Sequence, residues 1–102
     1  MYIALRAISS SSVEANWTQP SSDSVQYYTN HTITCTSTHG VYTAVTQHIN
    51  VSAAVNESMH TIITGLTANT SYNCCVSVYS ELGKSEDACG SVSTGMTIKT
   101  DF

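Results

Sequence analysis

Charged residues are scarce in this chain of 102 residues, and positively charged ones most of all. Only 10% of the residues are charged, Arg6 is the single Arg beside two Lys, and the formal net charge is -4. A surface that binds nucleic acid or an anionic membrane needs clustered Lys and Arg. The composition therefore argues against both classes of partner.

Long apolar runs are missing as well. No stretch approaches the roughly 18 apolar residues of a membrane-spanning helix, so no insertion of this segment into a bilayer is expected. The opening stretch MYIALRAISSSS also lacks the positive start and long apolar centre of a secretory signal. We therefore expect Met1 to begin a segment of a longer protein, with any signal or anchor outside it.

The sequence contains no motif of an enzyme or a metal site. There is no Gly-x-Ser-x-Gly elbow and no phosphate-binding loop, and Ser is too abundant for a Ser, His and Asp trio to carry meaning. No Cys-x2-Cys or His-x3-His pair occurs, and His39, His48 and His60 fall in or beside different loops. We expect no catalytic residue, no cofactor and no metal, and we expect His31 in the core or at its edge.

What the chain does contain is Asn in a particular context. Five of its six Asn open an Asn-x-Ser/Thr sequon for glycosylation, where the abundance of Ser and Thr predicts about one or two. Four Cys, an even number in a short chain, favour disulfides. Together these features predict an extracellular or cell-surface location. The candidate glycosylation sites are Asn16, Asn30, Asn50, Asn56 and Asn69.

Apolar residues recur at every second position in short runs, which predicts β-strands and leaves no helical pattern. Val13, Ala15 and Trp17, for example, share one face of a predicted strand. Seven antiparallel strands in about 100 residues are the signature of an immunoglobulin-like β-sandwich, an all-β fold whose rival here is a small open barrel. The predicted strands cover about residues 3–8, 13–18, 28–37, 41–51, 59–64, 72–78 and 88–94.

Four motifs, in order, resemble the fibronectin type III family over about residues 3–94. WTQP is similar to the family's second-strand Trp followed by a Pro, and HTITC to its alternating third strand. GLTANTSY resembles a Gly-Leu turn with a Tyr six residues after the Leu, and ELGKS resembles the hairpin between the last two strands. The resemblance implies one domain over residues 1–102, in which Trp17, Leu66 and Tyr72 are structural. The Tyr72 ring would pack inside while its hydroxyl bonds back to the backbone.

The arrangement implied by this resemblance also pairs the four Cys. Adjacent strand residues point to opposite faces, so Cys74 and Cys75 need separate partners. In the family the third, sixth and seventh strands are neighbours in one sheet, which implies an inner disulfide Cys35–Cys74 and an outer disulfide Cys75–Cys89. The alternative for the inner pair is two free thiols buried as small apolar residues.

The resemblance implies a non-catalytic extracellular module of a larger cell-surface or matrix protein. It would act as a spacer and mediate adhesion or contact with a protein ligand, with flanking domains in the same chain. Two alternatives are an accessory domain of a secreted enzyme and a module that pairs with its own kind. Glycans on several sequons would leave the final hairpin and the outer face near Cys75 and Cys89 as the open contact surface. The candidate contact loop carries no Arg-Gly-Asp and consists of Glu81, Leu82, Gly83, Lys84, Ser85, Glu86 and Asp87.

Overall fold

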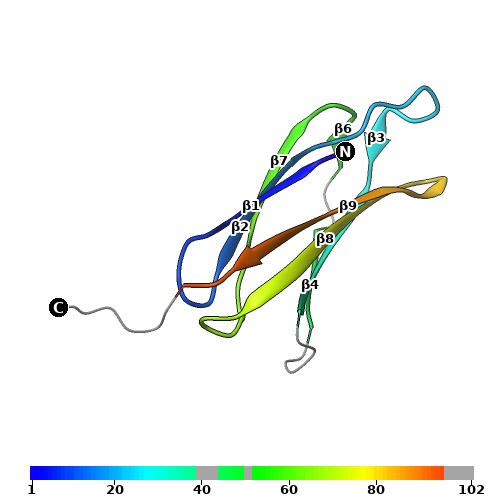
Figure 1. The fold of residues 1–102 in the computed structure, drawn as a ribbon. Helices are drawn as coiled ribbons and strands as arrows, with labels where there is room; N and C mark the ends of the chain where they lie inside the picture. The colour runs from blue at the N-terminus through cyan, green and yellow to red at the C-terminus, as the bar shows by residue number, and fades with distance from the viewer. Residues whose placement is uncertain (39–43, 50–51, 96–102) are drawn as a thin grey trace.

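The computed structural model describes residues 1–38, 44–49 and 52–95, which form two main β-sheets (Figure 1). All paired strands in these residues run antiparallel. They are β1 (Ile3–Ala7), β2 (Val13–Thr18), β3 (Tyr27–Tyr28), β4 (Asn30–Ser37), β5 (Val45–Ile49), β6 (Ala53–Ala54), β7 (Ser58–Ile63), β8 (Ser71–Ser80) and β9 (Gly83–Ser93).

One sheet has the strand order β1-β2-β7 and the other has the order β5-β4-β8-β9, while β3 and β6 form a short pair of their own. Alternating side chains of the two larger sheets meet in a common core. The central strands show this most clearly, because Ile33 on β4 and Val76 on β8 are fully buried and lie opposite each other in register. The all-β sandwich predicted from the alternation is confirmed.

The structure has nine strands in its described residues where seven were predicted. The predicted third strand divides at Thr29, because Tyr27 and Tyr28 pair with Ala54 and Ala53 while the chain from Asn30 onward pairs with β5 and β8. Strands of two residues are too short to show a periodicity, which is why the sequence did not reveal β3 and β6. Part of the predicted strand 41–51 lies outside the described residues, and β5 is the part that is described.

A chain of three buried polar side chains crosses the core between β2 and β4. The Trp17 indole Nε1 donates to Gln19 Oε1 at 2.7 Å, and Gln19 Nε2 lies 2.6 Å from His31 Nε2. Because the indole is a donor only, it fixes the Gln19 carbonyl toward itself and the amide NH2 toward His31. His31 Nε2 must then accept, so the imidazole is neutral with its proton on Nδ1.

Lowering the pH from about 7.5 to about 5.5 is expected to destabilise this fold through His31. Burial lowers the pKa of the His31 imidazole below its ordinary value of 6.5, an effect larger than the opposing one from the Ile49 backbone. As the pH falls through about 6.5, the His31 imidazole of the unfolded chain binds a proton, whereas the buried imidazole of the folded chain binds one only at lower pH. The free energy of unfolding should therefore fall as the pH drops below that value, by at most about 1.4 kcal/mol per pH unit.

Urea unfolding at a series of pH values measures this effect, and His31→Gln is the matched variant that should lose it. Glu14 does not obscure the result. Hydrogen bonds from Arg6 and then His60 lower the pKa of its carboxyl from the ordinary 4.5, so its contribution to stability is lost only at still lower pH. A urea midpoint of the parent chain that stays constant down to about pH 5.5 would contradict the buried neutral imidazole.

Candidate functional site

Two disulfides join the strands of the four-stranded sheet. Cys35 on β4 is bonded to Cys74 on β8, and both residues are fully buried. Cys75 on β8 is bonded to Cys89 on β9, where Cys89 is exposed. Each pair lies directly opposite in the strand register. These are the pairs that the family resemblance implied, one on each face of the sheet.

The three residues expected to be structural lie in the core. Trp17 packs there with its indole bonded to Gln19, and Leu66 packs at the turn that leads from β7 to β8. The Tyr72 ring is buried, and its hydroxyl accepts a hydrogen bond from the Thr67 backbone N–H at 2.8 Å. This bond fastens the crossing between the two sheets to the start of β8.

The sequon asparagines are distributed around the surface. Asn16 lies in the middle of β2, Asn30 begins β4, and Asn56 and Asn69 sit in turns with positive φ angles of 63° and 53°. All four are exposed. Asn50 lies outside the described residues. The described sequons are therefore accessible, and their occupancy stays a prediction.

The predicted contact loop is mostly strand, which corrects the prediction of a seven-residue loop. Only Glu81 and Leu82 form the turn, and β9 begins at Gly83, which has a φ of 108°. Gly83, Lys84, Glu86 and Asp87 pair with β8, and Ser85 lies at a register shift between Val78 and Tyr79. Polar composition suggested a loop, because this part of β9 buries no face. Backbone hydrogen bonds join it to β8, and within β9 an ion pair of 2.8 Å links Lys84 Nζ to Asp87 Oδ2.

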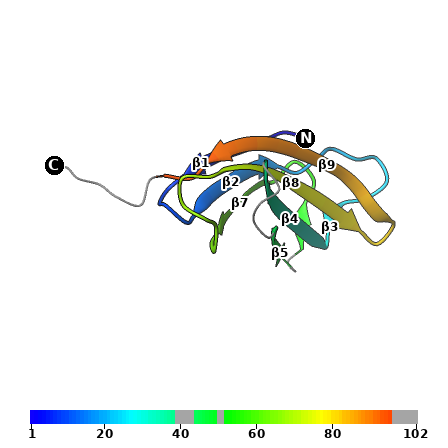
Figure 2. The same cartoon turned by 60° about the horizontal axis from the view of Figure 1, so that its bottom comes forward.

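The hairpin tip lies at the same end of the sandwich as the loop between β2 and β3, as both views show (Figure 2). We call this end the apical surface, made of residues 21–27 and 81–87. Leu82 is 70% exposed and Tyr27 is 58% exposed. One groove is lined by Val25, Tyr27 and Glu81, and a second groove, which shares Val25 with the first, is lined by Leu82.

Carboxylates outnumber amines on the apical surface. Among the described residues it holds four carboxylates, Asp23, Glu81, Glu86 and Asp87, against one Lys. Two of them form ion pairs, Asp87 with Lys84 and Glu86 with the amino group of Met1, and the hydrogen bond to Asp87 raises the pKa of the Lys84 amine. The surface therefore combines two exposed apolar side chains with an excess of carboxylates.

The loop of the apical surface is held in one conformation by its own contacts. The Tyr28 hydroxyl donates to the Pro20 carbonyl at 3.0 Å, and Ser22 Oγ accepts from the N–H groups of Ser24 and Val25. The backbone of Gln26 also accepts from Val55 N–H at 3.1 Å. A surface that is ordered before binding loses less entropy when a partner docks. The contact surface predicted from the sequence did not include this loop.

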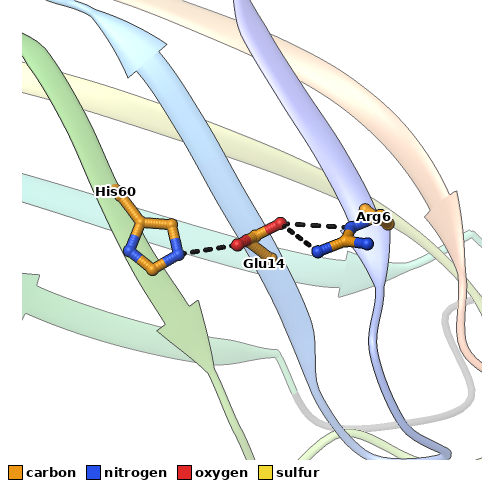
Figure 3. Close-up of polar contacts among 3 residues, drawn as sticks. All are labelled: Arg6, Glu14 and His60. Atoms are coloured by element: carbon orange, nitrogen blue, oxygen red, sulfur yellow. Dashed lines mark hydrogen bonds and ion pairs between the residues drawn. The ribbon is translucent and has the colours of Figure 1, made fainter.

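The outer face of the other sheet carries an exposed charged cluster that the sequence did not reveal (Figure 3). Arg6 on β1 donates to Glu14 Oε1 from both Nε and Nη2, at 3.1 and 2.9 Å. His60 Nε2 on β7 lies 2.8 Å from Glu14 Oε2. The three residues come from three neighbouring strands, so the strand register brings together side chains 46 positions apart.

The described residues hold neither a metal-binding cluster nor a membrane-spanning helix. No three His, Cys, Asp or Glu side chains there are grouped so that they could hold a metal ion. No helix in the same part of the chain is long and apolar enough to cross a membrane.

Comparison with known proteins gives one family. The model of the fibronectin type III domain matches residues 2–90. No curated protein matches the sequence. The fn3 domain of human collagen alpha-1(XX) chain is similar in structure, with a TM-score of 0.70 and 20% identity over 97% of this chain and 86% of that one.

Two further solved structures show the same fold. The FN5 domain of Drosophila Lar matches with a TM-score of 0.59 and 16% identity, over 91% of this chain and 90% of that one. The FN1-FN3 domains of chicken CNTN1 match with a TM-score of 0.67 and 20% identity, over 91% of this chain. This chain covers only 30% of that CNTN1 structure. Such low identities establish a shared fold and nothing finer.

Proposed function

The chain belongs to the fibronectin type III family, and from this we propose that it works as a non-catalytic extracellular module that contacts another protein through its apical surface. Domains of this family serve as building blocks of larger proteins, which supports flanking domains in the same chain. The observation that carries the contact is the pair of exposed side chains, Leu82 and Tyr27, on an apical surface rich in carboxylates. Exposed Tyr and other large side chains are favoured at protein interfaces.

The chemistry of the surface describes the partner. Leu82 would enter an apolar pocket, and the carboxylates around it would face Lys or Arg on the rim of that pocket. Two of the four described sequons lie away from this surface, since Asn16 is on the other sheet and Asn69 precedes β8. Asn56 lies beside the apical loop, where it accepts a hydrogen bond from Ser21 Oγ at 2.7 Å, and Asn30 follows Thr29, which lines one of the grooves.

The variant Leu82→Ser is expected to weaken partner binding about tenfold or more, since truncating a central apolar anchor of an interface costs at least about 1.4 kcal/mol. Biotinylated tetramers of the secreted domain, applied to cells that each display one extracellular protein, measure the binding by flow cytometry. Binding should also weaken as salt is added, because carboxylates of the apical surface are exposed to solvent.

Ile62→Ser is the matched control, because Ile62 is 42% exposed but lies on β7 in the other sheet. If Leu82→Ser and Ile62→Ser bind the partner equally well, the contact does not lie on the apical surface. Sedimentation at rising concentration separates contact with another protein from pairing of two copies of this chain. A domain whose tetramers bind no displayed protein would contradict the proposed role.

A further inference from the structure

Tyr2 is the most exposed large apolar side chain of the described residues, at 77%. It lies just before β1 and lines a groove on the three-stranded sheet, together with Ala4, Asn16, Thr18, Ser58 and Met59. The acceptor Asn of one sequon and the Thr of the same sequon therefore lie in the same groove as an exposed aromatic ring. Neither the family match nor the core explains why a Tyr is exposed at this place.

The strand register shows which way a group attached to Asn16 can extend. Its neighbours across the sheet are Ala4 on β1 and His60 on β7. Ala4 is small and leaves space above the strand. On the other side of Asn16, Arg6 and His60 form the charged cluster with Glu14 (Figure 3). The open direction from Asn16 is the one over Ala4 toward Tyr2.

We propose that Asn16 carries an N-linked glycan whose first N-acetylglucosamine packs its apolar C–H face on the Tyr2 ring. In the attachment step, Asn16 Nδ2 forms a bond to C1 of the sugar and loses one proton, and the lipid diphosphate of a lipid-linked oligosaccharide donor leaves. Aromatic rings present a negative face that favours such C–H groups, and the Thr18 and Ser58 hydroxyls offer polar contacts beside it. This inference rests on the extracellular setting proposed above.

The sequon at Asn56 is the rival source of a sugar at Tyr2, because Asn56 and Tyr2 both line a neighbouring groove. The structure favours Asn16. The Asn56 side chain already accepts a hydrogen bond from Ser21, whereas no described residue hydrogen-bonds to the side chain of Asn16. Asn16 is also opposite Ala4, which is the second residue of β1, and Tyr2 comes immediately before that strand.

The experiment compares Tyr2→Ala in the secreted chain and in an Asn16→Gln background, with thermal unfolding as the readout. With the glycan present, Tyr2→Ala is expected to lower Tm by about 4 °C more than it does in the Asn16→Gln background. Tyr2→Phe keeps the ring and should behave like the parent chain. Tyr27→Ala, the control at another exposed Tyr, should shift Tm equally in both backgrounds.

Glycopeptide mass spectrometry and nuclear Overhauser contacts decide the remaining outcomes. Contacts between Tyr2 ring protons and the first sugar of the Asn16 glycan are expected. An Asn16 that is bare while other sequons are occupied overturns this inference and leaves the extracellular proposal in place. Bare asparagines at every sequon overturn both. An equal Tm shift for Tyr2→Ala in the two backgrounds, or sugar contacts from Asn56 alone, also overturns the assignment to Asn16.

Discussion

Replacing the inner disulfide by the double variant C35A/C74A is expected to lower the free energy of unfolding by about 4 kcal/mol or more. The two Cys are separated by 39 positions, and the chain-entropy model gives about 4 kcal/mol for closing a loop of that size in the unfolded chain. Both sulfur atoms are also buried in the core, so Ala at these positions leaves unfilled space. A loss of this size is a large part of the about 5–15 kcal/mol that stabilises a typical domain.

The outer pair is the matched control. In C75A/C89A the loop has a separation of 14 positions, for which the same model gives about 3 kcal/mol, and Cys89 is exposed, so little packing is lost. Urea midpoints with equal slopes compare the two variants, after a non-reducing peptide map has established the linkages in the parent chain. An outer variant that costs as much as the inner one would contradict this account.

The sequence predicted the core well because burial at every second position is a strong physical constraint. A slip of one residue would expose the whole buried set of a strand. The bounds of β2 were predicted as the structure has them, and Tyr72, Cys74, Val76 and Val78 are all buried on β8. One face of each of these strands packs against the opposite sheet, so the alternation of apolar and polar residues shows which positions face the core.

The hairpin beyond the core was predicted less well, for the same reason. Residues Gly83 to Asp87 bury no common face, so the strand leaves no alternation in the sequence. The apical surface was therefore predicted only in part. Its hairpin was identified, but the contribution of Val25 and Tyr27 depends on how the loop before β3 packs across to the hairpin, and that packing is a long-range property.

The polar contacts across strands could be predicted least. Nothing in the sequence links the charged cluster of Arg6, Glu14 and His60. Only the register of three neighbouring strands brings these side chains together. The sequence only weakly indicated that Gln19 is buried. Gln19 lies two residues after the inward Trp17 and directly before Pro20, where the sequence suggests the start of a loop, yet its side chain is buried. Two inward polar rings on facing strands need a partner between them, and Gln19 is that partner.

The variant Gln19→Met is accordingly expected to lower the free energy of unfolding by about 2–6 kcal/mol, although Met has nearly the same size. Gln19 bonds both to the Trp17 indole and to the His31 imidazole, and all three side chains are buried. Met leaves a donor on Trp17 and an acceptor on His31 without partners, and each such buried group costs about 1–3 kcal/mol. Gln47→Met is the control, since Gln47 is only partly buried and bonds to one group, Thr61 Oγ1.

A double-mutant cycle measures the interaction energy between Gln19 and His31. If the cost of Gln19→Met comes from unpaired partners, then His31→Leu in the Gln19→Met background removes one of them, and the double variant should cost less than the sum of the two single variants. If the contact between Gln19 and His31 contributes nothing to stability, the two costs should add. The urea midpoints of the four chains decide, and additive costs, or a Gln19→Met as mild as Gln47→Met, would show that the Trp17, Gln19 and His31 contacts contribute little to stability.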